Sequence, residues 1–171
     1  MNLPIPREIA AVADYETWAQ SRLDDHTWAY LAGAAADEIT HHTNRRAFDQ
    51  RRLQSRVLAD VGAGHTRLTL CGSPLEHPIL LAPVAYQRLF HPDGELATVC
   101  AAAALNTGMV VSTLASTALE EIARMAESPL WFQLYYQPNQ SETLALVRRA
   151  EVAGYQALMV TVDAPVSGVR N

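Results

Sequence analysis

The chain has 171 residues, of which 49% are hydrophobic and 18% charged, and its formal net charge is −5 at pH 7. This composition is typical of one ordinary globular domain with a real core, and the absence of any basic run argues against nucleic acid or an anionic membrane surface as partner. No apolar stretch approaches the ~20 residues that cross a bilayer, and the amino terminus lacks a signal-peptide core. We therefore expect a cytoplasmic protein without a membrane span.

The first part of the chain predicts two short helices and a small hairpin. Asp14 and Asp25 each precede apolar residues at helical spacing, which predicts that they cap two helices. Farther on, alternating residues around Thr66–Leu70 lead to the turn Cys71–Pro74, a pattern typical of a hairpin.

Beyond the hairpin, short apolar runs alternate with amphipathic segments. Strands are predicted at residues 79–85, 109–114, 130–135 and 157–162. Helices lie between them, the first starting near residues 91–95, the second at a capping box of Thr117 and Glu120, and the third at Asn139. The first strand is a continuous apolar run, which predicts burial on both faces.

This alternation predicts an α/β protein with a parallel sheet. Right-handed crossovers favour the N-terminal half of a (β/α)8 TIM barrel over a doubly wound sheet. Residues 1–77 would then be helices and a hairpin that cover the barrel, and residues 78–171 its first four strands. Because a barrel closes at eight strands, four strands leave two apolar edges open. We therefore expect a C-terminal half, on a second chain, to complete it.

Polar side chains fall where the predicted strands end, the face on which barrel enzymes build their sites. They are Ser112, Gln133, Tyr135, Thr161 and Asp163. Ser, Gln and Thr both donate and accept hydrogen bonds, so they suit a heterocycle that displays carbonyls and ring nitrogens. Each also has a structural alternative: Ser, Thr and Asp often satisfy turns at strand ends, although a buried amide such as Gln133 requires partners. His41 and His42 lack ligand spacing with other groups, and no metal site is expected.

Several short segments, taken together, resemble one enzyme family. The segments, in chain order, are Tyr30 with Ala32–Gly33, Asp37–Glu38, Asn44–Phe48, Leu81–Ala85, His91–Glu95, Phe132–Tyr135, and Thr161–Pro165 with Gly168 and Arg170. They resemble the N-terminal half of the FMN-dependent α-hydroxy acid oxidases and dehydrogenases, a family that includes glycolate oxidase, lactate oxidase and mandelate dehydrogenase. The segments follow the family order over nearly the whole chain.

The resemblance implies a role for each matching position. For the cofactor FMN, the residues implied are Pro83, Val84 and Ala85 against the ring, with Ser112, Gln133 and Thr161 hydrogen-bonded to it. For the substrate they are Tyr30, Tyr135 and Arg170. Tyr135 and Asp163 would act in catalysis, Asp163 by pairing with a histidine. In the family that histidine, a lysine beside the flavin, a second substrate arginine and the phosphate-binding loops all lie beyond the position of Asn171.

The implied activity is FMN-dependent oxidation of an L-2-hydroxy acid to the 2-oxo acid by hydride transfer to the flavin. Removal of the hydride requires a base for the hydroxyl proton and a cation near the flavin, and neither is expected within these residues. Relatives are commonly tetramers, so a homo-oligomer of the completed barrel is expected. Two alternatives remain: a non-catalytic half-barrel interaction protein, and another flavin- or phosphate-binding barrel enzyme.

Overall fold

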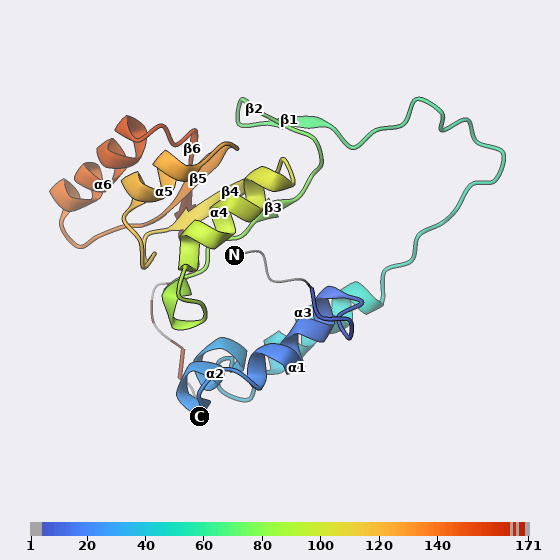
Figure 1. The fold of residues 1–171 in the computed structure, drawn as a ribbon, viewed down its shortest axis with the longest axis horizontal. Helices are drawn as coiled ribbons and strands as arrows, with labels where there is room; N and C mark the ends of the chain where they lie inside the picture. Colours follow the sequence, from blue (N-terminus) through green and yellow to red (C-terminus); the bar gives the residue numbers. More distant parts are fainter. Residues whose placement is uncertain (1–4, 165, 167, 170–171) are drawn as a thin grey trace. The chain divides into compact units, whose positions relative to one another are not determined.

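The computed structural model describes residues 5–164, 166, 168 and 169, and the chain divides into two compact units. Met1–Gln54 and Ser167–Asn171 belong to a helical unit, and Ser55–Val166 form a sheet unit. Figure 1 labels the α-helices and strands of both units. The hairpin therefore groups with the parallel strands. Among the described residues, no helix is long and apolar enough to cross a membrane.

The helical unit contains a short 3-10 helix, η1 (Val12–Asp14), and three α-helices. These are α1 (Tyr15–Gln20), α2 (Asp25–Ala32) and α3 (Ile39–Asp49). The two helices predicted from sequence are present. Asp14 stands at the N-cap position of α1, as predicted, but makes no side-chain cap bond, and the predicted Asp25 cap of α2 is wrong. The carboxylate of Asp14 accepts from the amides of Ala10 and Ala11 before the helix, and Asp24 caps α2 by accepting from the amides of His26 and Thr27. Asp25 lies one position too late to cap.

Helix α3 was not predicted. Its sequence is mostly polar, with Ile39, Ala47 and Phe48 as the apolar residues, and none of its residues is buried. Loose i, i+4 pairs run along it, such as Arg45 with Asp49 at 3.7 Å. Just before α3, the amide of Ala36 donates to the carbonyl of Val169 at 2.8 Å, so the chain after the last strand returns to the helical unit.

The sheet unit begins with the predicted hairpin, formed by β1 (Leu68–Leu70) and β2 (Ser73–Leu75) in antiparallel pairing. Gly72, with φ +79°, makes its tight turn possible. Ser73 is buried, accepts from the indole of Trp131 at 3.4 Å and hydrogen-bonds to Gln156, so the hairpin packs on the parallel sheet.

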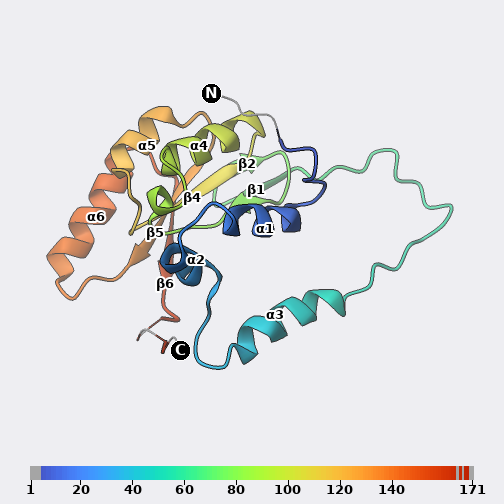
Figure 2. The same cartoon turned by 60° about the horizontal axis from the view of Figure 1, so that its bottom comes forward.

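The parallel sheet has the order β3-β4-β5-β6, with strands at Leu80–Leu81, Gly108–Ser112, Leu130–Tyr135 and Ala157–Thr161. Between them lie the 3-10 helix η2 (Gln87–Leu89) and helices α4 (Gly94–Ala104), α5 (Leu119–Met125) and α6 (Gln140–Val152). Figure 2 shows the three helices on one face of this sheet. The predicted α/β class with a parallel sheet is confirmed.

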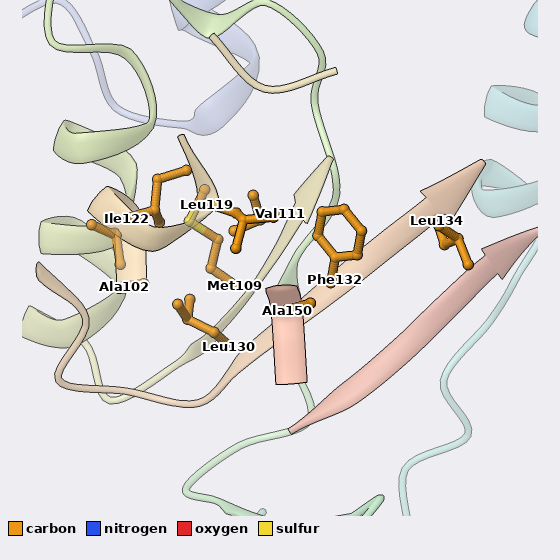
Figure 3. Packing of buried hydrophobic residues seen from close by; sticks show 10 residues of the cluster. Ala102, Met109, Val111, Leu119, Ile122, Leu130, Phe132, Leu134 and Ala150 are labelled. Carbon is orange, nitrogen blue, oxygen red and sulfur yellow. The ribbon is translucent and has the colours of Figure 1, made fainter. Parts of the chain in front are cut away.

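The core lies between that face and the helices. Alternate strand residues such as Val111 and Phe132 meet helix residues such as Val99, Ile122 and Ala150, all at most 1% exposed. Figure 3 shows most of this cluster at close range. Alternation along each strand then directs the intervening side chains to the opposite, inner face.

Two details of the predicted sheet were wrong. The first strand is only Leu80–Leu81, and it is half-buried because, in the part of the chain that the structure describes, it is an edge strand paired with β4 alone. Pro83, two residues after the end of β3, has no amide to extend the ladder. Thr117 does not form the predicted capping box with Glu120; its hydroxyl donates instead to Glu95 at 3.0 Å. The strand at 130–135 and the Asn139 cap of α6 are confirmed.

Candidate functional site at the carboxyl ends of the strands

The polar strand-end residues share the inner face of the sheet. Ser112 pairs in register with Gln133, and Tyr135 pairs with Thr161. Since their neighbours Val111, Phe132 and Leu134 face the helices, the polar side chains face the other way. The structure therefore brings together four of the residues predicted from sequence, from three adjacent strands.

Gln133 is the centre of a hydrogen-bond network and is 2% exposed. Its Oε1 accepts from the amide of Thr113 at 3.1 Å and from the hydroxyl of Ser112 at 3.3 Å, while its Nε2 donates to Thr161 Oγ1 at 2.8 Å. The amide group is thereby held in one orientation across β4, β5 and β6. These bonds use one of the two Nε2 hydrogens, and Thr161 acts in its bond as acceptor, so each retains a proton to donate.

Thr113 supports this network and was missed by sequence reasoning. Its hydroxyl donates to the carbonyl of Gln133 at 2.6 Å and accepts from the amide of Tyr135 at 3.1 Å. Ser112 is engaged in both directions, because its hydroxyl also accepts from the amide of Leu114 at 3.0 Å. The signal for Thr113 was its place directly after Ser112 at the strand end.

The predicted flavin-facing segment follows β3. Pro83, Val84 and Ala85 lie in the connection to η2, where Val84 is 42% exposed. The amide of Tyr86 donates to the carbonyl of Leu114 at 3.0 Å, so the end of this segment is fixed to the connection after β4. The segment follows β3 and the network joins β4, β5 and β6, so both lie at the carboxyl ends of adjacent strands.

Three further residues were predicted for the site: Tyr30, Asp163 and Arg170. Asp163 is exposed and lies two residues after the end of β6, and Tyr30 belongs to α2 of the helical unit. Arg170 lies outside the described residues. The predicted roles of these three residues stay predictions. Among the described residues, no group of three or more His, Cys, Asp or Glu side chains could hold a metal ion.

The chemistry of the site is that of recognition. Gln133 and Thr161 offer hydrogen-bond donors, Tyr135 presents a partly exposed phenol, and exposed Val84 and Leu114 add apolar surface. Fixed donors beside apolar surface suit a flat heterocycle with carbonyls and ring nitrogens. Fold and site together define a class: an α/β protein with hydrogen-bonding side chains gathered where parallel strands end, the face on which barrel enzymes build their sites.

The chain belongs to the FMN-dependent dehydrogenase family, whose model matches residues 19–171. It is 48% identical over 162 residues to the L-lactate oxidase of Alicycliphilus denitrificans, covering 95% of this chain and 44% of that protein. It is 40% identical to 2-hydroxyacid oxidase 2 of Mus musculus, covering 95% of this chain and 46% of that protein.

Solved structures agree with these sequence comparisons. A crystal structure of mandelate oxidase superposes with a TM-score of 0.90 at 40% identity, covering 95% of this chain and 49% of that one. A mandelate oxidase mutant with a C4a-OH-FMN adduct superposes with a TM-score of 0.88 at 39% identity, covering 92% and 47%. The chain therefore spans about half the length of the relatives it matches, and the predicted family is confirmed.

Proposed function

We propose that this chain forms the N-terminal half of an FMN-dependent oxidase of L-2-hydroxy acids, and that it supplies part of the flavin site and part of the substrate site. The observation that carries the proposal is the Gln133 network: a buried amide held by Ser112, Thr113 and Thr161 at the carboxyl ends of three parallel strands. The relatives named above include oxidases of lactate and other 2-hydroxy acids.

In this proposal, Gln133 and Thr161 donate hydrogen bonds to the flavin, with Ser112 beside them, and Pro83, Val84 and Ala85 line its ring. Ser112 acts chiefly by orienting Gln133, because its proton is already given to Oε1. Bound FMN would supply the chemistry of accepting a hydride. The chain's own contribution is to orient the ring and to exclude water from one side of it.

The substrate would be held by hydroxyl and guanidinium groups. Tyr135 and Tyr30 each direct a phenol to the oxygens of the 2-hydroxy acid, and Arg170 binds the carboxylate through two parallel hydrogen bonds. Asp163 orients a histidine from the remaining half of the barrel and stabilises its cationic form after it takes the hydroxyl proton.

A closed (β/α)8 barrel is part of the proposal. Among the described residues, β6 pairs only with β5, and its helix-side residues Leu158 and Val160 are 44% and 51% exposed. Exposed apolar residues on an edge strand favour a further strand and its covering helix. Sequence equivalent to the remaining half of the relatives would supply both, whether on a second chain or on this one. The completed barrel is the species expected to assemble into tetramers.

The test is to combine this chain with sequence equivalent to that half and to measure flavin binding and turnover. We expect one stoichiometric complex with a flavin absorption band that bleaches anaerobically on addition of L-lactate or L-mandelate. Tyr135→Phe should bind FMN normally and bleach more slowly, because it removes only the phenolic hydroxyl. A colourless complex would refute the proposal and favour an interaction protein. A yellow complex inert to every 2-hydroxy acid would favour another flavin barrel enzyme.

A further inference from the structure

Glu95 is a buried carboxylate that the proposed site does not use. It lies in the first turn of α4 and is only 1% exposed, a rare environment for a charged side chain unless it is well hydrogen-bonded. Its Oε1 accepts from the amide of Ser116 at 2.7 Å and from the amide of Gln87 at 3.4 Å, and its Oε2 accepts from the hydroxyl of Thr117 at 3.0 Å. Three donors therefore converge on one carboxylate.

These donors come from two different connections. Gln87 follows the segment Pro83–Ala85 in the connection after β3, while Ser116 and Thr117 belong to the connection after β4. Two more bonds join the same two connections: the amide of Arg88 donates to Ser116 Oγ at 3.1 Å, and the amide of Tyr86 donates to the carbonyl of Leu114 at 3.0 Å. Glu95 is thus the common acceptor of the two loops that border the strand ends.

The start of α4 lies close to η2, and a glycine beside Glu95 makes this approach possible. Gly94, the first residue of α4, has φ +47°, and a Cβ there would lie 2.8 Å from Cγ of Arg88 and 3.3 Å from its amide nitrogen. A side chain at this position would push α4 away from η2. Thr98, one turn into the helix, donates from its hydroxyl to Oε1 of Gln87 at 2.6 Å, which is a second contact between α4 and η2.

We propose that Glu95 is a positioning residue that holds the segment Pro83–Ala85 in its flavin-binding conformation. The proposal rests on the proposed function, since it assigns Glu95 to the same flavin site. Hydrogen bonds to an ionised acceptor are about twice as strong as neutral ones. A buried carboxylate can therefore fix two loops before the cofactor arrives, and a binding loop that is already ordered loses less entropy on binding.

The test compares Glu95→Gln with Glu142→Gln in the completed barrel. Glutamine keeps the shape of glutamate and removes the charge, and Glu142 is an exposed glutamate in the first turn of α6. Hydrogen exchange of peptides covering residues 82–90 and 113–118 is measured without FMN, and the Kd for FMN is measured by quenching of its fluorescence. We expect Glu95→Gln to speed exchange in both peptides, to leave the β5 and α6 peptides protected, and to raise the Kd about tenfold. Glu142→Gln should change neither.

Two results would overturn the proposal: unchanged exchange in both loops, or faster exchange with an unchanged Kd, which would leave Glu95 a purely structural role. If Glu95→Gln fails to fold, Thr117→Val removes one donor and keeps the charge. Thr117→Val should raise the Kd for FMN by about threefold, and an unchanged Kd would also overturn the proposal. If the wild-type complex binds no FMN, the proposed function is refuted, and the exchange data alone show whether Glu95 orders the two loops.

Discussion

Replacing Gln133 with leucine should weaken the whole sheet unit. The side chain makes three hydrogen bonds, to Ser112, Thr113 and Thr161, and is 2% exposed. At roughly 1 kcal/mol for each bond, the loss is about 3 kcal/mol. The larger apolar area of leucine offsets about 1 kcal/mol of this. We therefore expect the free energy of unfolding to fall by about 2 kcal/mol.

Urea unfolding followed by circular dichroism measures this change. With an m-value of about 2 kcal/mol per M, the unfolding midpoint should fall by about 1 M. Gln140→Leu is the matched control: Gln140 is exposed at the first position of α6, so its midpoint should stay near that of the wild type. A midpoint for Gln133→Leu within about 0.2 M of the wild type would show that the network does not hold the strand ends together.

Three further predictions concern parts of the fold outside the site. Burial raises the pKa of the Tyr155 phenol, so its folded-state pKa exceeds the unfolded value of about 10; stability should be fully present below that pH and lost as pH rises above it, and Tyr155→Phe should flatten this loss in pH-dependent urea melts. The hydrogen bond from Arg149, 2.8 Å away, lowers the pKa of Glu120, so stability present above pH ~4.5 should be lost as pH falls through the folded pKa. Because both side chains are about half exposed, Glu120→Gln should cost less than about 1 kcal/mol at pH 7 and nothing at pH 2, as tested by melts at both pH values. Gly108→Ala would place a Cβ 2.5 Å from Cδ2 of Leu80 and 3.2 Å from a backbone carbonyl, so we expect a loss of about 1–2 kcal/mol by thermal unfolding, and an unchanged Tm would contradict the tight packing of β4.

The predictions from sequence are most accurate for features that depend on neighbouring residues, such as strand alternation and helix caps. The run Leu130–Tyr135 is β5, and its one amide side chain, Gln133, lies on the inner face of the sheet. Asn139 caps α6 through its own side chain. Gly154, with φ +91°, ends that helix region as expected. Strand alternation and a cap each depend on a few neighbouring residues, so a short window of sequence predicts them.

Features that depend on distant residues were missed. The apolar run after residue 78 predicts a long buried strand, but its length depends on neighbours on both sides, and within the described residues β3 pairs with β4 alone. Thr117 had the spacing of a capping box, yet its hydroxyl bonds to Glu95, 22 residues earlier in the chain. No local pattern distinguishes these two partners of one threonine. For the site, the predicted positions of Ser112, Gln133 and Thr161 at the strand ends are correct, whereas Glu95 was noted only as part of the segment His91–Glu95, without its contacts to Gln87, Ser116 and Thr117.

The outer edge of β6 carries a constraint on whichever strand continues the sheet. Its pairing with β5 fixes Thr161 beside Tyr135 on the inner face and leaves Leu158 and Val160 toward the helices. If the register of the neighbouring strand were shifted by one residue, its apolar side chains would face the inner side of the sheet and its polar side chains would face the helices. In the proposed barrel, the strand that follows β6 must therefore pair with it in one register.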